Sequence, residues 1–256
     1  MPQVPSTQQI LGVHFFVGSP AEVIANFVRA GGVLVVPAAP AMVKLRYEDE
    51  LYRRALTAAD FAIADSGLMV LVWKILKGKN VTRISGLRYL QSLMNHPSLR
   101  TSGSVLLILP SEAAKQKTLT WSREKNLPLG DDDCCVAPHY GPTAEDPELL
   151  RIVERRRPAH VIIAIGNGPQ EKLGTFLRNN LSYRPAIHCI GAALGFVSGD
   201  QISIPNWADQ LYLGWLFRLI AQPRIFIPRL WRASQLPWLI WKYGEQLPPT
   251  RARQMS

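Results

Sequence analysis

The chain has 256 residues, of which 47% are hydrophobic and 19% are charged, and its formal net charge is +10 at pH 7. This composition excludes an intrinsically disordered chain and is sufficient for the core of one domain, with room for an appendage. It contains no run of about 18 apolar residues, so we expect no membrane-spanning helix. The basic excess favours an anionic partner, which could be nucleic acid, a phosphate-bearing substrate or a membrane surface.

The cysteines and the first residues bear on the compartment. Cys134 and Cys135 are adjacent and Cys189 stands alone, which makes neither a disulfide framework nor a metal-binding spacing. The first ten residues, MPQVPSTQQI, lack the basic and apolar regions of a signal peptide, and we expect them to be loose. These observations predict a cytoplasmic location.

The first half of the chain alternates short apolar runs with helical patterns. We expect strands over 12–17, 33–36 and 61–64. We expect helices from the N-cap Ser19 to Gly31-Gly32, over 42–56, over 68–76 and over 87–94.

The second half repeats this rhythm up to about residue 195. We expect strands over 105–109, 134–137, 161–165 and 186–190, and helices over 111–126, over 147–157 and from Pro169 onward. Strands that alternate with helices over this length predict an α/β fold, with a mainly parallel sheet flanked by helices.

The stretch 161–173, VIIAIGNGPQEKL, organises this pattern as a strand, a glycine loop and a helix. In such a unit the free N–H groups of the helix's first turn face the rim where α/β folds bind ligands. The residues that would approach an anionic group there are Gly166, Asn167, Gly168 and Gln170. A tight turn without a ligand is equally consistent with the spacing.

The last 50 residues differ from the rest of the chain. They contain five of the seven tryptophans and are interrupted by Pro223, Pro228 and Pro237, which predicts two or three short helices. Tryptophan with arginine on amphipathic helices is typical of a membrane-surface segment, although an ordinary helical cap on the core would use the same residues. The residues that carry the membrane prediction are Trp215, Arg218, Arg224, Arg229 and Trp231. We therefore expect a catalytic α/β domain over 1–205 and a helical, membrane-associating appendage over 206–256.

Two charged residues are candidates for chemistry in the first half. Asp65 follows the strand predicted over 61–64, at the edge where α/β proteins bind ligands. A general base, a turn former and a helix N-cap are all consistent with an aspartate before Ser66-Gly67. Arg83 stands in a short polar break, where it could hold a phosphate or lie on a solvated surface.

Other polar residues are less specific. His139 follows the strand predicted over 134–137, where it could contact substrate or be a plain loop residue. Glu171 stands in the first turn of its helix, where it could simply complement the helix dipole. The remaining histidines show no pairing with cysteine or carboxylates at ligand spacing, so we expect no metal site.

Taken together, these pieces resemble the WecG/TagA/CpsF family of bacterial glycosyltransferases over about residues 12–232. The motifs that carry the resemblance are Asp65 at a strand end, LKG at 76–78, RISG at 83–86, HYG at 139–141, GNGPQEK at 166–172, IGAALGFVSGD at 190–200, IP at 204–205 and LGWLFRLIAQPRIFIPRLW at 213–231. Their order and spacing match throughout, which makes the resemblance specific although each motif alone is weak.

The resemblance implies a Rossmann-like core and an inverting transfer of N-acetylmannosamine or a related sugar. The donor would be a UDP-sugar, and the acceptor a polyprenyl-diphosphate-linked sugar at the cytoplasmic face of the membrane. Asp65 would be the general base, while Arg83 and Gln170 would contact the donor or its leaving diphosphate. The loop 166–168 and Gly191 would shape the nucleotide pocket. Neither a cofactor nor a metal is implied.

The sequence departs from the family pattern at three places. Pro37-Ala38-Ala39 stands where the family has Thr-x-Asn, Ser66 follows Asp65 where the family has glycine, and Leu213-Gly214-Trp215 replaces Leu-Glu-Trp. The lost polar groups at 37–39 leave a second hypothesis open, a non-catalytic UDP-sugar-binding or scaffolding member of the same fold. Self-association is also left open. Nucleic-acid binding is not expected, because no nucleic-acid motif accompanies the charge.

Overall fold

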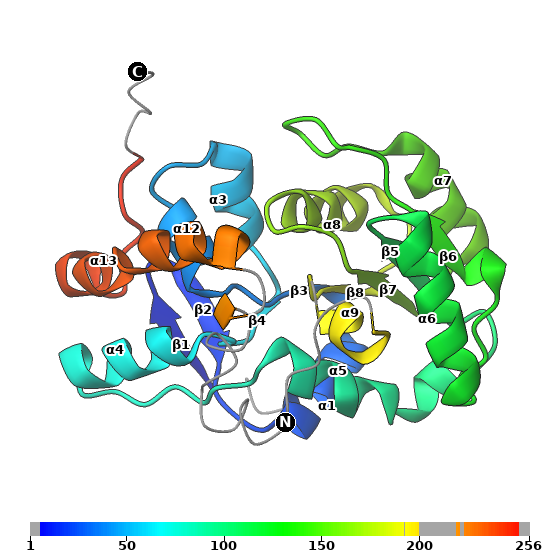
Figure 1. Ribbon diagram of the computed structural model, residues 1–256, viewed down its shortest axis with the longest axis horizontal. Helices are drawn as coiled ribbons and strands as arrows, with labels where there is room; N and C mark the ends of the chain where they lie inside the picture. Colours follow the sequence, from blue (N-terminus) through cyan, green and yellow to red (C-terminus); the bar gives the residue numbers. More distant parts are fainter. Residues whose placement is uncertain (1–5, 192, 200–218, 221–222, 251–256) are drawn as a thin grey trace.

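The structure is a computed structural model that describes residues 6–191, 193–199, 219–220 and 223–250, with the backbone alone at 225 and 226. An eight-stranded sheet runs through the molecule in the order β1-β2-β4-β3-β8-β7-β5-β6 (Figure 1). Only β1 and β2 pair antiparallel, and every other neighbouring pair in this sheet is parallel. The α/β fold with a mainly parallel sheet is confirmed.

The strands lie close to the expected ranges. They are β1 (Thr7–Ile10), β2 (Val13–Phe16), β3 (Gly32–Val35), β4 (Phe61–Ala62), β5 (Val105–Leu109), β6 (Cys134–Val136), β7 (His160–Ile163) and β8 (Ala186–Cys189). The helices are α1 (Pro20–Ala30), α2 (Ala39–Lys44), α3 (Glu50–Thr57), α4 (Gly67–Lys77), α5 (Gly86–Met94), α6 (Glu112–Glu124), α7 (Pro147–Arg156), α8 (Pro169–Asn180), α9 (Ala193–Val197), α12 (Pro223–Ala233) and α13 (Leu236–Tyr243). Two short 3₁₀ turns, η1 (Pro97–Arg100) and η2 (Asp131–Asp133), complete the described elements.

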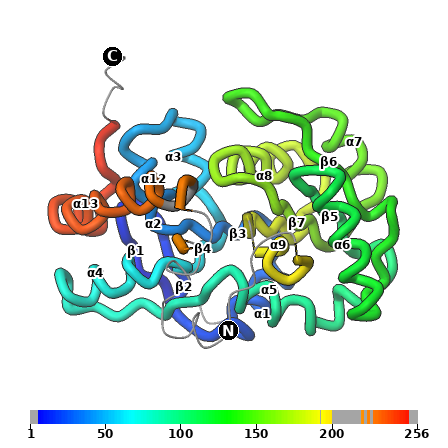
Figure 2. The backbone as a smooth tube through the Cα atoms, in the orientation of Figure 1, coloured from blue at the N-terminus to red at the C-terminus, as the bar shows by residue number. Residues whose placement is uncertain are grey.

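Helices cover both faces of the sheet (Figure 2), and each face has its own hydrophobic core. Helices α2, α3, α4, α7, α8, α12 and α13 contribute residues to the first core, and helices α1, α5, α6 and α9 contribute residues to the second. Strand β3 shows how one strand serves both, because Val33 and Val35 point into the first core and Leu34 into the second. This explains the continuous apolar runs that the sequence shows at the central strands.

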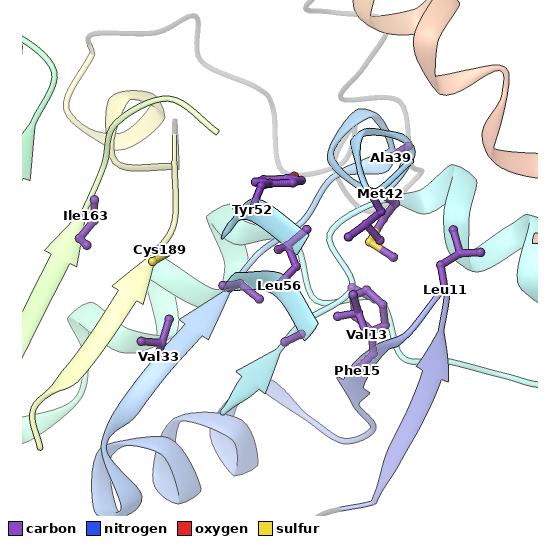
Figure 3. Packing of buried hydrophobic residues seen from close by; sticks show 14 of the residues in the cluster. Leu11, Val13, Phe15, Val33, Ala39, Met42, Tyr52, Leu56, Ile163 and Cys189 are labelled. Carbon is purple, nitrogen blue, oxygen red and sulfur yellow. The ribbon is translucent and has the colours of Figure 1, made fainter. Parts of the chain in front are cut away.

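The first core joins the N-terminal hairpin to α2 and α3. In Figure 3, Val13 and Phe15 of β2 lie beside Met42 of α2 and Leu56 of α3. Tyr52 of α3 is fully buried in the same cluster, and its hydroxyl donates to the carbonyl oxygen of Ala41 at 3.0 Å. The hydrogen bond satisfies the one polar atom that this large side chain brings into the core.

Two expectations for the N-terminal half were wrong. Residues 7–10 form the edge strand β1 rather than a loose segment, joined to β2 by a turn in which Leu11 and Gly12 both have positive φ. The polar sequence of an edge strand hides it from an apolar-run criterion. The expected helix over 42–56 is two helices, because the side chain of Asp49 accepts from the N–H of Tyr52 and begins α3 anew.

The C-terminal helices α12 and α13 pack on the N-terminal half, against α2 and α4. Leu236, Leu239 and Ile240 of α13 are buried in the first core. The N–H groups of Leu11 and Gly12 donate to the carbonyl oxygens of Gly244 and Glu245, at 2.9 and 2.8 Å. The boundary expected at 205 lies outside the described residues. Of the helices that the structure describes, none combines the length and the apolarity needed to cross a bilayer.

A chain of hydrogen bonds runs through the second core. It joins Tyr89 to His188 at 2.8 Å, His188 to His160 at 3.1 Å, His160 to Ser98 at 2.7 Å and Ser98 to His96 at 2.6 Å. Neutral histidines satisfy every link if each group donates to the next in that order. If His160 or His188 gained a proton, both of its ring nitrogens would be donors, and one hydrogen bond of the network would then face a second donor. The network therefore favours uncharged imidazole rings.

We expect acid to destabilise the protein through this chain. Burial lowers the pKa of His160 to about 4 and that of His188 well below its usual value. Below pH 6.5 the unfolded chain therefore binds protons that the folded chain does not. Between pH 7.5 and 5.5 the two histidines should cost roughly 2 kcal/mol, or about 5 °C in Tm, measurable by thermal unfolding. His160→Gln should reduce this pH effect and His139→Gln, at an exposed site, should not; equal Tm values at both pH values in the wild type would contradict the prediction.

Candidate functional site

The candidate site lies at the carboxyl ends of β4, β3, β8 and β7. Asp65 follows β4 by three residues and is half-buried. A parallel bridge pairs Ala64 with Arg83, and the N–H of Ile84 donates to the carbonyl oxygen of Ala64 at 3.0 Å. The topology therefore brings together two candidate residues that are 18 positions apart in the sequence.

The Asp65 carboxylate is held by the start of α5. Its Oδ1 accepts from the N–H of Gly86 at 3.0 Å, while Nε of Arg83 donates to the Asp65 carbonyl oxygen at 3.0 Å. This arrangement fixes the direction of the carboxylate. The hydrogen bond from Gly86 involves Oδ1 and not the second oxygen, Oδ2.

Gly86 also places this carboxylate beside the centre of the sheet. A Cβ atom at Gly86 would lie 3.4 Å from Val36 and 3.5 Å from Ala193, which follow β3 and β8. The start of α5 thus contacts the ends of strands from both halves of the chain. In α/β folds, ligands bind outside the carboxyl ends of such central strands.

The glycine loop after β7 is held by Glu171, which is fully buried. Its two carboxylate oxygens accept from Nδ2 of Asn167 at 2.8 Å, the N–H of Gly168 at 2.6 Å and Nε2 of Gln170 at 2.9 Å. Burial raises the pKa of Glu171, and the hydrogen bonds from Gln170 and Gly168 act in the opposite direction. The sequence signal for this role is a glutamate at the third helical position, as in a capping box, a signal that the possible role as a complement to the helix dipole did not use.

Gln170 connects this loop to the end of β8. Its side chain is 2% exposed, and its Oε1 accepts from the N–H of Gly191 at 2.8 Å. Gly191 has φ +56, a conformation that favours glycine. The structure thus brings Gln170 and Gly191 together, with the Gln170 amide engaged inside the protein. Contact of Gln170 with a substrate stays a prediction.

The exposed part of the loop is Gly166 and Asn167. A Cβ atom at Gly166 would meet nothing within 4 Å, so the backbone there is open to a ligand. Lys44 of α2 brings a positive charge to the same loop, because its Nζ lies 3.5 Å from the carbonyl oxygen of Asn167. Sequence analysis missed Lys44, since nothing in its own neighbourhood marks it and only the packing of α2 against the loop places it here.

The departure at 37–39 is visible at the same edge. Ala38 is the N-cap of α2 and makes no side-chain hydrogen bond to the helix. Because serine, threonine, asparagine and aspartate are preferred there, this short helix begins without its usual polar cap. Residues 37–39 therefore supply no side-chain hydrogen-bond donor or acceptor to the candidate site. Those groups must come from the other loops at this edge.

His139 lies apart from these residues. It is exposed and follows β6, the edge strand, which stands five positions from β4 in the strand order. With neighbouring strands about 4.8 Å apart, that separation is roughly 24 Å across the sheet. The described structure does not bring His139 to Asp65, and its contact with a substrate stays a prediction.

Of the predicted membrane residues, those that the structure describes lie on α12, which packs against α2. Arg224, Arg229 and Trp231 of α12 are exposed, Trp231 by 77%. Trp215 and Arg218 lie outside the described residues, as do Asp200, which ends the motif at 190–200, the IP motif at 204–205, and residues 213–218 and 221–222 of the motif at 213–231.

Comparison with known proteins places this geometry in context. A model of the glycosyl transferase WecG/TagA/CpsF family matches residues 8–252, nearly the whole chain. None of the curated proteins compared with the chain matches it.

Proposed function

The chain belongs to the WecG/TagA/CpsF family of glycosyl transferases, and on that premise we propose that it is an inverting enzyme of cell-envelope or exopolysaccharide synthesis. It moves N-acetylmannosamine or a related N-acetylhexosamine from a UDP donor to a polyprenyl-diphosphate-linked sugar. The observation that carries the proposal is the Asp65 carboxylate, fixed by Gly86 at the ligand edge with Arg83 beside it.

Asp65 acts as the general base in this proposal. The acceptor hydroxyl attacks the anomeric carbon of the donor sugar and gives its proton to Asp65. A new bond forms between the acceptor oxygen and the anomeric carbon, the bond to the UDP oxygen breaks, and UDP leaves with the electron pair. One positioned carboxylate is sufficient for this single displacement, which inverts the configuration.

The leaving diphosphate requires fixed positive charge or N–H groups. Arg83 supplies a guanidinium beside Asp65, and Lys44 supplies an ammonium beside the loop 166–168. The open backbone at Gly166 supports close approach of the nucleotide. Gln170 and Gly191 act by holding the two loops at a fixed separation.

The acceptor determines where the enzyme works. A polyprenyl chain remains in the bilayer, so the protein binds peripherally at the cytoplasmic face of the cell membrane, with residues 206–256 as the membrane-associating appendage. The basic and tryptophan-rich sequence of that segment supports this location. Self-association is compatible with the proposal and is not required by it.

Transfer of sugar is the direct test. The full chain is incubated in detergent with UDP-N-acetylmannosamine and a polyprenyl-diphosphate-N-acetylglucosamine analogue, and the disaccharide lipid is measured by mass. We expect one new glycosidic bond per UDP released. If other UDP-N-acetylhexosamines react instead, the sugar assignment is wrong and the reaction class is right.

A second candidate function is favoured by the uncapped start of α2 at Ala38. A chain that binds UDP, measured by calorimetry, but transfers no sugar from any UDP donor would be a non-catalytic UDP-sugar-binding or scaffolding protein.

A further inference from the structure

Helix α4 has two apolar sides, of which only one is buried. Met69 and Trp73 point into the first core and are completely buried. Leu68, Leu71 and Ile75 follow the i, i+3, i+7 spacing of one helical stripe and are exposed by 38%, 56% and 70%. A surface helix of a soluble protein normally carries polar residues on that outer stripe, so α4 presents a surface that needs a partner.

Helices α12 and α13 add exposed apolar residues of the same kind. Ile227 and Trp231 of α12 are 58% and 77% exposed, and Trp241 of α13 is 66% exposed. The three helices together contain six lysines and arginines and no aspartate or glutamate. Their exposed sides thus combine apolar side chains with positive charge alone.

Helix α13, which follows α12 directly in the sequence, lies beside α4 although the two are more than 150 residues apart in the chain. Helix α13 packs against α4, and Nζ of Lys77 lies 3.5 Å from the carbonyl oxygen of Trp241. Lys79, just beyond α4, forms an ion pair with Glu245 at 2.7 Å. Figure 1 shows α4, α12 and α13 grouped at the β1 end of the sheet.

We propose that α4 joins α12 and α13 in one docking surface, and that its partner is an anionic lipid bilayer. Tryptophan and leucine enter the interface between head groups and acyl chains, while lysine and arginine meet the phosphate groups. A second copy of this chain fits less well, because pairing these surfaces would bring positive helices against positive helices. The membrane surface therefore includes a helix of the α/β core and is not confined to the C-terminal segment.

This surface determines where the lipid-linked acceptor arrives. Asp65 stands two residues before α4, and the exposed stripe begins at Leu68, within one helical turn. If the proposed function is right, a bilayer on this stripe holds Asp65 near the depth of the head groups. A diphosphate-linked sugar would then reach the base while its polyprenyl chain stays in the membrane.

The test uses flotation of the full chain with vesicles. The variant combines Leu71→Gln with Ile75→Gln, which keeps the net charge and the helix propensity of α4. Wild type should bind vesicles rich in phosphatidylglycerol at least about tenfold more tightly than pure phosphatidylcholine vesicles. The variant should bind the anionic vesicles about tenfold more weakly than wild type, because two apolar side chains no longer enter the interface. Val136→Gln, on the exposed edge strand β6, is the matched control and should bind as wild type does.

Vesicle binding, oligomeric state and sugar transfer together distinguish a membrane partner from a second copy of the chain. If the α4 variant binds anionic vesicles as wild type does, the proposal is wrong. If it also converts a dimer to a monomer in analytical ultracentrifugation without changing vesicle binding, the partner is a second copy of the chain. Transfer to a water-soluble, short-chain acceptor should be unchanged in the variant. Vesicle binding without transfer by wild type would overturn the proposed function and leave the docking surface intact.

Discussion

Asp65→Asn is expected to lower the rate of sugar transfer by about 10²–10⁴-fold, because an amide cannot take the proton of the acceptor hydroxyl. The substitution should leave the fold intact. The amide oxygen of asparagine can still accept from the N–H of Gly86, which is the hydrogen bond that Oδ1 of Asp65 makes. Initial rates at saturating donor, together with thermal unfolding of both proteins, measure the two effects.

A matched control distinguishes the loss of a general base from a general effect of replacing an aspartate with asparagine at a helix N-terminus. Asp146 caps α7 by accepting from the N–H of Leu149 at 2.9 Å, and asparagine caps a helix equally well. Asp146→Asn should therefore transfer sugar at the wild-type rate. Similar rates for Asp65→Asn and wild type would remove Asp65 from the mechanism, whereas unchanged UDP binding with lost transfer would support its role as the base.

Sequence patterns predicted the fold because its central strands are buried on both faces. Such strands read as apolar runs, as at β5 and β7, and their helices begin at recognisable caps such as Ser85 and Ser111. The predictions were wrong where a strand is buried on one face only, and where a helix N-cap lies inside a stretch that was predicted as a single helix. Strand β1 is a polar edge, and Asp49 restarts a helix inside a stretch whose apolar spacing continues.

The candidate site was only partly predictable for a different reason. Asp65, Gly166 and Gly191 are marked by their place after a strand, and the parallel topology brings such strand ends to one edge. No local pattern marks Lys44, whose position depends on how α2 packs against a loop more than 120 residues away. Likewise, the helix predicted over 68–76 carried no expectation of an exposed apolar stripe, because the spacing of apolar residues predicts a helix but does not show which of its sides is covered.

Glu171→Ala should cause the largest loss of stability among substitutions at this edge, about 3 kcal/mol or 6–12 °C in Tm. The change removes the acceptor for three donors, of which the N–H of Gly168 and Nε2 of Gln170 are buried. Each buried donor left without a partner costs about 1–3 kcal/mol. Thermal and urea unfolding measure the loss.

The matched control for Glu171 is Glu148, which stands in the first turn of α7 with its side chain 81% exposed. Both carboxylates complement a helix dipole, but only Glu171 holds a loop, so Glu148→Ala should change stability by less than about 0.5 kcal/mol. Equal losses at the two positions would reduce Glu171 to a dipole effect. A larger loss at Glu171, with a raised KM for the donor in Glu171→Gln, would mean that this carboxylate positions the loop. Since the Gln170 amide joins that loop to Gly191, one buried acid would then set the separation of the two segments proposed to enclose the nucleotide.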